Sequence, residues 1–249
     1  GNSPVIQIAK IDTGKCRLFL KLENHNPGGS IKDRMALAMI ERAEQEGKIR
    51  PGETLVEATA GNTGLALALV AAQKGYKLLL VIPDKMSQEK IFQLKAMGAQ
   101  IIMTRSDVPK GHPEYYQDLA EKMAKQTPGS YYVNQFQNPA NPAAHESSTG
   151  PEIWEQLNHH VDAIVCGVGT GGTLTGLSRF FKKVSPQTEI VLADPVGSIL
   201  VDYIKTGKFG DAGSWFVEGI GEDFVPDIAD LSRVKRGYTI CDKQSFLAA

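Results

Sequence analysis

The sequence contains little cysteine, and its three cysteines lie far apart. Cys16, Cys166 and Cys241 form no metal-ligand spacing, and Cys166 stands in an apolar run in which a thiol packs as a small hydrophobic group. An odd number of unpaired cysteines is typical of a reducing compartment, so we expect a cytoplasmic protein without a metal site. The chain also lacks an apolar stretch of the ~20 residues that a membrane span needs. Its N-terminus lacks the charged-then-apolar layout of a signal peptide.

An excess of charge of one sign is missing as well. The formal net charge is -1, and no run rich in lysine and arginine occurs. Nucleic acids and anionic membranes select dense positive charge, so the sequence argues against both as partners. The 249 residues, 42% of them hydrophobic and 22% charged, are enough for one large domain or two modest domains of an ordinary α/β protein.

Short apolar runs alternate with helical patterns along the chain. Most runs lack polar–apolar alternation, as expected for strands that are covered on both faces of a parallel sheet. The predicted strands are 17–22, 54–58, 78–83, 101–104, 131–134, 163–168, 189–194 and 238–241. The predicted helices run from Ser30, as N-cap, to Gly47, and over 63–74, 87–97, 114–126, 151–157 and 173–183. This alternation predicts a parallel α/β fold.

The segment 135–151 is polar and interrupted by prolines, which marks it as a connection between domains. We therefore predict an N-terminal α/β domain over residues 1–140 and a C-terminal α/β domain over residues 141–249. After Asp242, a candidate N-cap, only about one helical turn follows, and one turn cannot support itself. We expect the C-terminal domain to be truncated at this end.

The strongest glycine motif is GVGTGGTLTG, residues 167–176, between a predicted strand and a predicted helix. Gly167, Gly169 and Gly172 satisfy the dinucleotide pattern G-x-G-x-x-G, and Asp194 ends the next strand, where such an acid would bind a ribose. Taken alone, the motif therefore fits an NAD-dependent dehydrogenase.

The physical content of this motif is broader than a dinucleotide site. Glycines let backbone N–H groups approach an anion closely, and a helix N-terminus adds partial positive charge. Thr170 and Thr173 add hydroxyl donors, which suit a terminal phosphate monoester at least as well as a buried pyrophosphate. A phosphorylated cofactor of another kind is therefore equally compatible with the motif.

A second glycine turn, NPGGSIKDR at residues 26–34, places Lys32 in the first turn of a predicted helix. A lysine at the positive end of a helix dipole is disfavoured as a cation. An amine that must be neutral to attack an aldehyde supplies a reason for this position.

A third turn, EATAGNTG at residues 57–64, again joins a strand to a helix. Backbone amides at Gly61, Asn62 and Thr63, with the hydroxyls of Thr59 and Thr63, predict a second anion cradle that fits a carboxylate as well as a phosphate. An ordinary strand-to-helix turn capped by Asn62 is the alternative interpretation.

Seven segments, in this order, resemble the cysteine synthase and cystathionine β-synthase family of fold-type II pyridoxal phosphate enzymes. They are NPGGSIKDR (26–34), EATAGNTG (57–64), KMSQEK (85–90), NQFQNPANP (134–142), TGPEIW (149–154), GVGTGGTLTG (167–176) and EGIGEDFVP (218–226). The resemblance covers the whole chain. It implies a tryptophan synthase β-subunit-like fold of two three-layer α/β domains with mostly parallel sheets. It also implies pyridoxal 5'-phosphate as the cofactor and a homodimer.

The resemblance assigns roles to residues of this sequence. Lys32 corresponds to the catalytic lysine, which forms the Schiff base with the cofactor and then acts as general base on the substrate. Asn62 corresponds to the residue that hydrogen-bonds the cofactor's ring hydroxyl. The residues that match the phosphate-binding loop are Gly169, Thr170, Gly171, Gly172 and Thr173. The residues that match the substrate site are Thr59, Gly61, Asn62, Thr63, Gln135 and Gly219.

The implied activity is exchange of the β-substituent of a small amino acid for a thiol or sulfide. DPVGSIL (194–200) and EGIGEDFVP (218–226) favour cystathionine synthesis from serine and homocysteine. HESSTGPEIWE (145–155) instead favours cysteine synthesis from O-acetylserine and sulfide.

Two departures from the family pattern keep an inactive, cofactor-binding scaffold open as an alternative. Ala60 stands where the family usually has serine, and the family's C-terminal hydroxyl residue facing the pyridine nitrogen has no counterpart. The dehydrogenase alternative leaves Lys32 and the turn at 57–64 unexplained.

Overall fold

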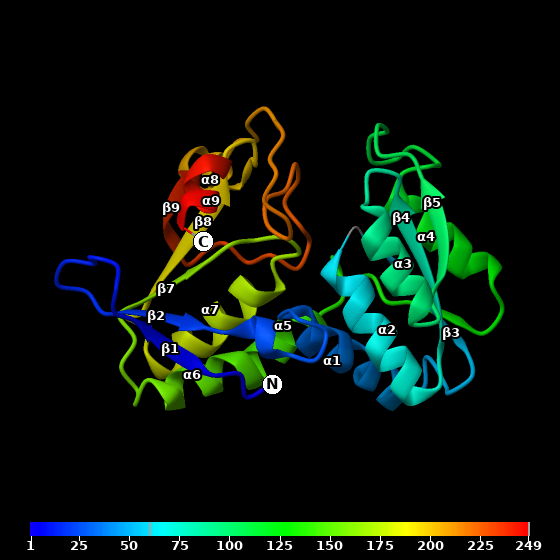
Figure 1. Cartoon of the computed structure of the whole chain (residues 1–249), viewed down its shortest axis with the longest axis horizontal. Coiled ribbons are helices and arrows are strands. Elements are labelled where there is room, and N and C mark those ends of the chain that lie inside the picture. The colour runs from blue at the N-terminus through cyan, green and yellow to red at the C-terminus, as the bar shows by residue number, and fades with distance from the viewer. Residues whose placement is uncertain (60, 249) are drawn as a thin grey trace. The chain divides into compact units, whose positions relative to one another are not determined.

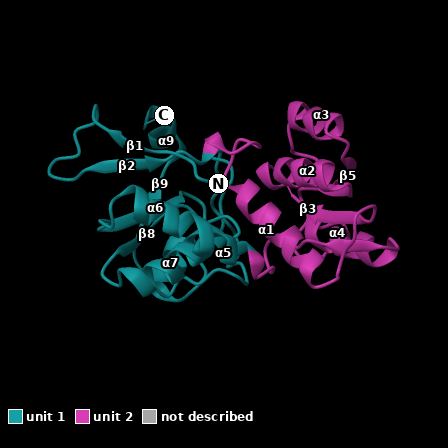
Figure 2. Ribbon diagram, turned by 90° about the horizontal axis from the view of Figure 1, so that it is seen from below, with its two compact units in different colours: residues 1–23, 141–249 teal, residues 24–140 magenta. Residues whose placement is uncertain are grey.

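The computed structural model describes residues 1–59 and 61–248, which form two compact units (Figures 1 and 2). Unit 1 contains residues 1–23 and the described part of 141–249, and unit 2 contains residues 24–140. Residues 1–23 thus join the C-terminal part of the chain, a departure from the predicted division into 1–140 and 141–249. Ala60, singled out in the sequence, lies outside the described residues.

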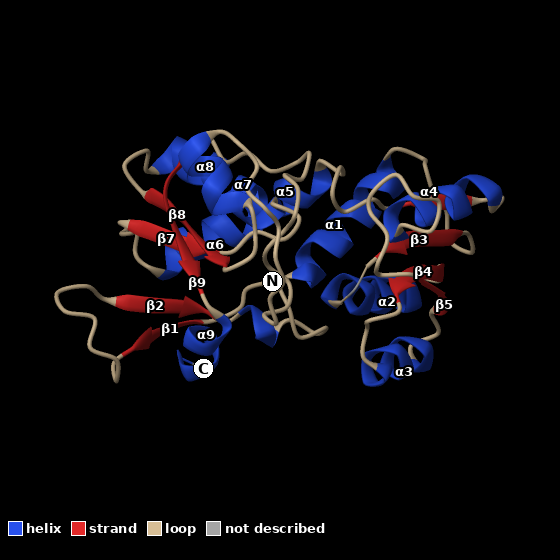
Figure 3. Ribbon diagram, turned by 90° about the horizontal axis from the view of Figure 1, so that it is seen from above, coloured by secondary structure: helices blue, strands red, loops and turns tan. Residues whose placement is uncertain are grey.

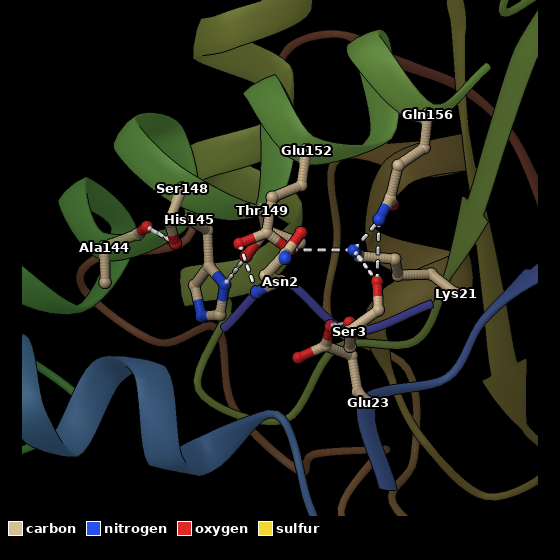
Figure 4. A network of polar contacts seen from close by, with 10 residues as sticks. All are labelled: Asn2, Ser3, Lys21, Glu23, Ala144, His145, Ser148, Thr149, Glu152 and Gln156. Atoms are coloured by element: carbon tan, nitrogen blue, oxygen red, sulfur yellow. Dashed lines mark hydrogen bonds and ion pairs between the residues drawn. The ribbon is translucent and has the colours of Figure 1, made fainter. Parts of the chain in front are cut away.

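A polar network explains why the N-terminal residues belong to unit 1. Strands β1 (Val5–Ile8) and β2 (Leu18–Lys21) form an antiparallel hairpin. At its end, Lys21 Nζ donates to Glu152 Oε2 at 2.7 Å and to Gln156 Oε1 at 2.8 Å, as Figure 4 shows. The side chains of Lys21 and Glu152 are only 11% and 18% exposed, so the pair is less screened by solvent than a surface ion pair.

Unit 2 is a parallel sheet in the strand order β5-β4-β3-β6, with helices on both of its faces (Figure 3). The strands are β3 (Thr54–Ala58), β4 (Lys77–Pro83), β5 (Gln100–Thr104) and β6 (Ser130–Tyr132). The helices are α1 (Lys32–Gln45), α2 (Asn62–Lys74), α3 (Gln88–Ala96) and α4 (Tyr116–Gln126), and a 3₁₀ turn at Glu23–His25 precedes α1. Parallel pairing throughout this sheet confirms the predicted fold class.

The two central strands of unit 2, β3 and β4, are covered on both faces, as the sequence predicts. Strand β4 is buried from Leu78 to Pro83. On one face, Val56 and Val81 pack against Ala120 of α4, and all three side chains are fully buried. Figure 3 shows α2 and α3 on the other side of the sheet. The carboxyl ends of β3 and β4 therefore lie at one edge of a rigid sheet.

Unit 1 contains a second parallel sheet, in the order β7-β8-β9. Its strands are β7 (Ala163–Cys166), β8 (Glu189–Pro195) and β9 (Val234–Ile240). Its helices are α6 (Gly150–Gln156), α7 (Gly172–Val184), α8 (Leu200–Thr206) and α9 (Asp242–Ala248). Leu174 and Phe181 of α7, both fully buried, join Leu192 of β8 in the core, so α7 is fixed against the sheet along its length.

The segment 135–151, predicted as a connection between domains, contains the boundary between the two units at 140/141, but most of it is helical and not a loop. Helix α5 (Ala140–Ala144), a π-helical turn η2 (His145–Thr149) and α6 follow one another without a break. Pro142 lies in the first turn of α5, where no intrahelical N–H bond is lost. The wide turn before α6 accommodates Pro151, which has no N–H to donate.

Among the described residues, every helix is too short or too polar to cross a bilayer. In the same part of the chain, His, Cys, Asp and Glu side chains form no group suited to a metal ion.

Candidate functional site

The glycine turn of unit 1 follows β7 and ends at the N-terminus of α7. Gly171 precedes the helix in the left-handed conformation, with φ +85°. Among the described residues, no side chain caps α7. The first N–H groups of a helix without such a cap are available to donate hydrogen bonds to a bound anion.

Close packing within unit 1 explains why glycine recurs in this turn. A Cβ on Gly169 would lie 2.7 Å from the carbonyl oxygen of Gly219, and a Cβ on Gly171 would lie 2.5 Å from the Cβ of Ala229. The Gly221 N–H also donates to Val168 O at 2.8 Å. The structure therefore brings Gly219 against the predicted phosphate loop.

Asn141 supports the same turn, and the sequence motifs did not reveal its role. The Asn141 side chain is fully buried, and its Nδ2 donates to Thr170 Oγ1 at 3.0 Å. Because an amide nitrogen can only donate, the Thr170 oxygen accepts, and its own proton is directed elsewhere. The Thr170 hydroxyl therefore keeps its proton for another acceptor, and a phosphate oxygen is chemically suited to accept it.

His145 is a second supporting residue of the turn, close to but outside the predicted set. Its ring is 1% exposed, and Nδ1 lies 2.9 Å from Thr149 Oγ1 (Figure 4). Its Nε2 lies 3.4 Å from Thr173 Oγ1. His145 thus links the π-helical turn to the first turn of α7.

Lys32 is the first residue of α1, so the predicted N-cap at Ser30 is one residue too early. Ile31 occupies the N-cap position with helical backbone angles and makes no side-chain cap. Ser30 Oγ still accepts the Lys32 N–H at 3.3 Å, which explains the serine. The structure places Lys32, half-buried, in the first helical turn.

The two glycines before α1 serve the conformation of this turn. Asp33 Oδ2 accepts the Gly28 N–H at 2.5 Å, and a Cβ on Gly28 would overlap the Asp33 carboxylate. Gly29 adopts the left-handed conformation, with φ +77°. These contacts fix the backbone immediately before and after Lys32.

The third turn connects β3 to α2 in unit 2, and its threonines are buried. Gly61 precedes α2, and its N–H donates to Thr59 Oγ1 at 3.1 Å. Thr59 and Thr63 are each only 3% exposed. A Cβ on Gly64 would lie 3.1 Å from Thr59 Cγ2, so this glycine lets the turn close tightly on α2.

Gln135, 72 positions beyond Thr63, lies against this turn. Thr63 Oγ1 donates to Gln135 Oε1 at 2.6 Å, and Gln135 Nε2 donates to Ala58 O at 3.1 Å. Gln135 thus joins two buried residues of this predicted substrate turn, Thr59 and Thr63, whereas Gly61 is half-buried and Asn62 is exposed. The expectation that the Thr63 hydroxyl binds an anion directly needs revision, because its proton is used by Gln135.

Glu57 is the buried charged residue of the turn that sequence reasoning missed. It is 0% exposed, Oε1 accepts the Ala58 N–H at 2.7 Å and Oε2 accepts the Gln135 N–H at 3.1 Å. Burial raises the pKa of this carboxyl to about 8, although the two N–H groups act in the opposite direction. A glutamate inside the apolar strand TLVEA was the available signal for an internal polar contact.

Asp194 does not serve the dinucleotide interpretation. It is 1% exposed, and its Oδ2 accepts the Val201 N–H at 3.2 Å, in the first turn of α8. Burial raises the pKa of the Asp194 carboxyl. Because the Asp194 carboxyl accepts from a helix N-terminus, it is not presented to a ribose, so the dehydrogenase interpretation loses its ribose-binding residue.

Burial also affects Cys166. It raises the pKa of the Cys166 thiol to about 12, which makes that cysteine a poor nucleophile.

The parallel sheets, the glycine turn at α7 and the polar turn at α2 define an α/β enzyme built to hold a phosphorylated ligand. The family model described as pyridoxal-phosphate dependent enzyme matches residues 1–249. The chain therefore belongs to the pyridoxal-phosphate dependent enzyme family. This membership confirms the predicted family, fold class and cofactor. The glycine turn, with its Thr170 hydroxyl, fits the phosphate of that cofactor.

Individual relatives agree with this assignment. The chain is 42% identical over 252 residues to cystathionine beta-synthase of Apis mellifera, covering 100% of this chain and 50% of that protein. It is 44% identical over 229 residues to cysteine synthase of Staphylococcus aureus, covering 91% and 70%. A hydrogen sulfide-producing enzyme from Fusobacterium nucleatum superimposes with a TM-score of 0.91 at 36% identity, covering 99% and 80%. The chain thus spans about half the length of the cystathionine beta-synthases that it matches.

Replacing Gly172 by alanine should destabilise unit 1 by about 1–3 kcal/mol, the usual cost of overpacking. Gly172 has an ordinary helical backbone, so the loss comes only from overlap of the new Cβ with the Asn141 amide. Denaturant unfolding of the full chain measures the loss. The double variant Gly172→Ala/Asn141→Ala should recover part of it, since the overlapping side chain is gone. Equal stability of Gly172→Ala and wild type would contradict this packing.

Proposed function

We propose that the protein exchanges the β-substituent of serine, or of an O-activated serine, for a thiol, with serine and homocysteine as the favoured pair. The observation that carries the proposal is the polar turn at the start of α2, whose Thr59 and Thr63 side chains are buried. It combines backbone N–H groups at a helix N-terminus with the Thr59 hydroxyl, and Gln135 closes it from a distant segment. Such a turn fits the α-carboxylate of a free amino acid. The cystathionine beta-synthase relatives support the substrate pair.

We assign the residues of unit 1 to the cofactor's phosphate. The backbone N–H groups at the start of α7 and the hydroxyl of Thr170 donate to its oxygens, and Asn141 keeps that hydroxyl turned correctly. Thr173, linked to His145, adds a second hydroxyl at the same helix N-terminus. The residues assigned to the phosphate are Gly169, Thr170, Gly171, Gly172 and Thr173.

We assign the residues of unit 2 to the reacting groups. Pyridoxal phosphate, when bound, supplies the electron sink that makes the α-proton of an amino acid acidic. Lys32 Nζ anchors the cofactor, is displaced by the substrate amine, and then moves the proton at the substrate α-carbon. Asn62 donates to the cofactor's ring hydroxyl. The turn at the start of α2 holds the substrate carboxylate and so fixes the position of the β-carbon at which the leaving group is exchanged for the thiol. Gly219, in unit 1, is assigned to the substrate on the family resemblance.

Cysteine synthesis from O-acetylserine and sulfide is the second candidate. It is favoured by the cysteine synthase relative, of which the chain covers 70%. The segment 145–155, which includes the π-helical turn, resembles that branch of the family as well. The two candidates share every residue assigned above and differ only in the leaving group and the thiol.

Product analysis decides between the two candidates. The purified protein, loaded with pyridoxal phosphate, is given serine with homocysteine or O-acetylserine with sulfide, and products are identified by mass spectrometry. We expect cystathionine from the first pair at the higher kcat/KM. Cysteine from the second pair at the higher kcat/KM would assign the protein to the alternative. No product from either pair, with the cofactor bound, would instead favour a scaffold.

The proposal includes a homodimer, which the family resemblance implies, and a cytoplasmic location, which the odd number of unpaired cysteines favours. Analytical ultracentrifugation of the cofactor-loaded protein should give the mass of two chains, each of 27.0 kDa. A single species at the mass of one chain would contradict the dimer.

A further inference from the structure

The β3–β6 ladder of unit 2 stops immediately before the substrate-carboxylate turn. Val56 pairs with Tyr132, and the Val133 N–H still donates to Val56 O at 3.0 Å. Asn134 then takes the left-handed conformation, with φ +51°, which turns the chain out of the strand direction. The next backbone N–H, that of Gln135, is buried and needs an acceptor that the strand no longer supplies.

The carboxyl group of Glu57 supplies that acceptor. Its Oε2 accepts the Gln135 N–H at 3.1 Å, while Oε1 accepts the Ala58 N–H at 2.7 Å. In return, the Gln135 side chain donates from Nε2 to Ala58 O at 3.1 Å. Two side chains thus extend the β-ladder by one rung past its backbone end.

This rung fixes the orientation of the Gln135 amide. The carbonyl of Ala58 can only accept, so the amide group that faces it must be Nε2. Gln135 Oε1 then faces Thr63, and the Thr63 hydroxyl must be the donor across their 2.6 Å contact. Thr63 therefore donates to Gln135, and Gln135 donates to Glu57. These hydrogen bonds form a directed chain that links Glu57 to the second residue of α2.

We propose that Glu57 is a positioning residue for substrate-carboxylate binding: it holds Gln135, and through Gln135 it sets Thr63 and the start of α2. The inference rests on the proposed function, because it names the residue behind the proposed carboxylate turn. The inference also distinguishes the donor of that turn that is used within the protein from the donors that remain for the substrate. The Thr63 hydroxyl proton is committed to the protein, so the backbone N–H groups of α2 and the Thr59 hydroxyl are left to hold the substrate.

Exchanging Glu57 for glutamine tests the inference with little change in shape. An amide has one oxygen, so either the Ala58 or the Gln135 N–H would face an NH₂ group, and Gln135 would shift. We expect the affinity for L-serine to fall about tenfold, which corresponds to ~1.4 kcal/mol and the loss of about one hydrogen bond. The affinity for 2-aminoethanol, which lacks the carboxylate, should change less than about twofold. The ratio of the two affinities is read from the visible absorption of the bound cofactor.

A matched variant separates positioning from general weakening of unit 2. Glu44 of α1 is also a glutamate with two partners, Lys74 Nζ at 2.9 Å and Tyr76 Oη at 2.7 Å, and these partners lie at the C-terminal end of α2, opposite to the turn. Glu44→Gln should lower stability while leaving the serine to 2-aminoethanol ratio at its wild-type value. An equal loss of the ratio in Glu44→Gln and Glu57→Gln would overturn the proposal.

Thr63→Val provides a second route that keeps Glu57 intact. It removes the last bond of the chain, so the ratio should fall as in Glu57→Gln, and the double variant should be no worse than either single variant. Additive losses would overturn the directed chain. The proposed function fails separately, since a wild-type protein that forms no visible cofactor band refutes the cofactor site. A wild-type band with an unchanged ratio in Glu57→Gln refutes only the positioning role.

Discussion

Replacing Lys32 by alanine should lower kcat/KM by at least about 10³-fold and abolish covalent attachment of the cofactor. A positioned general base alone contributes typically about 10²–10⁴-fold, and this variant removes the anchoring amine as well. Initial rates with serine and homocysteine measure the first effect. Borohydride reduction followed by peptide mass spectrometry measures the second, since only the peptide with Lys32 should gain the cofactor's mass.

Lys48 offers the matched control for this experiment. It follows the opposite end of α1, where its ammonium lies 2.7 Å from Glu46 Oε2 and its side chain is 55% exposed. An exposed ion pair contributes little, so Lys48→Ala should keep wild-type kcat/KM and the wild-type mass gain at Lys32. A Lys32→Ala protein that retained more than about a tenth of the wild-type rate would contradict the role of Lys32.

The parallel strands could be predicted because their signal is local. Strand β3 was predicted with its structural bounds, 54–58, and β4 and β5 within one residue, since each is a short apolar run. Strand β1 was missed, because VIQI is four residues long and its partner β2 lies ten residues on. Antiparallel pairing of such short runs depends on packing that no local pattern records.

The segment 135–151 shows where local rules mislead. Proline and polar residues favour a loop, but Pro142 falls in a first helical turn and a π-helical turn precedes Pro151. Whether a proline breaks a helix depends on its position within that helix, and this position was not available before the helix was known.

The candidate site also contains parts that could be predicted from the sequence and parts that could not. The glycine turns could be located from the sequence because each lies between a strand and a helix. Asn141, His145 and Glu57 could not be assigned, since their roles consist of contacts with residues 29, 28 and 78 positions away. Such contacts are created by the tertiary fold, so motif reading finds the groups that face a ligand more readily than the groups that hold them.

Removing the Glu57 carboxyl should change the pH dependence of stability even without cofactor or substrate. Burial raises its pKa from 4.5 to about 8, so between these values the unfolded chain is ionised while the folded protein retains the proton. Unfolding then releases a proton, and stability falls as pH rises. The loss approaches ~1.4 kcal/mol per pH unit and roughly 5 kcal/mol over the whole window. Below about pH 4.5 both states are protonated and the contribution to stability is complete.

Denaturant unfolding of wild type and Glu57→Gln at several pH values between 5 and 9 measures this effect. Glutamine carries no titrating proton, so the variant should be the less stable protein at pH 5 and should gain on wild type up to about pH 8. The tyrosines on β6 do not interfere, because burial raises the pKa of both Tyr131 and Tyr132 further above this range.

Glu44→Gln gives the control curve. Its hydrogen bonds to Lys74 and Tyr76 hold the pKa of Glu44 below 4.5, so that group is ionised in both states throughout the window. Its loss should lower stability by the same amount at every pH from 5 to 9. Parallel curves for wild type and Glu57→Gln would show that the Glu57 carboxyl is ionised at pH 5 in the folded protein. In that case the two N–H groups of Ala58 and Gln135 would outweigh the cost of burial.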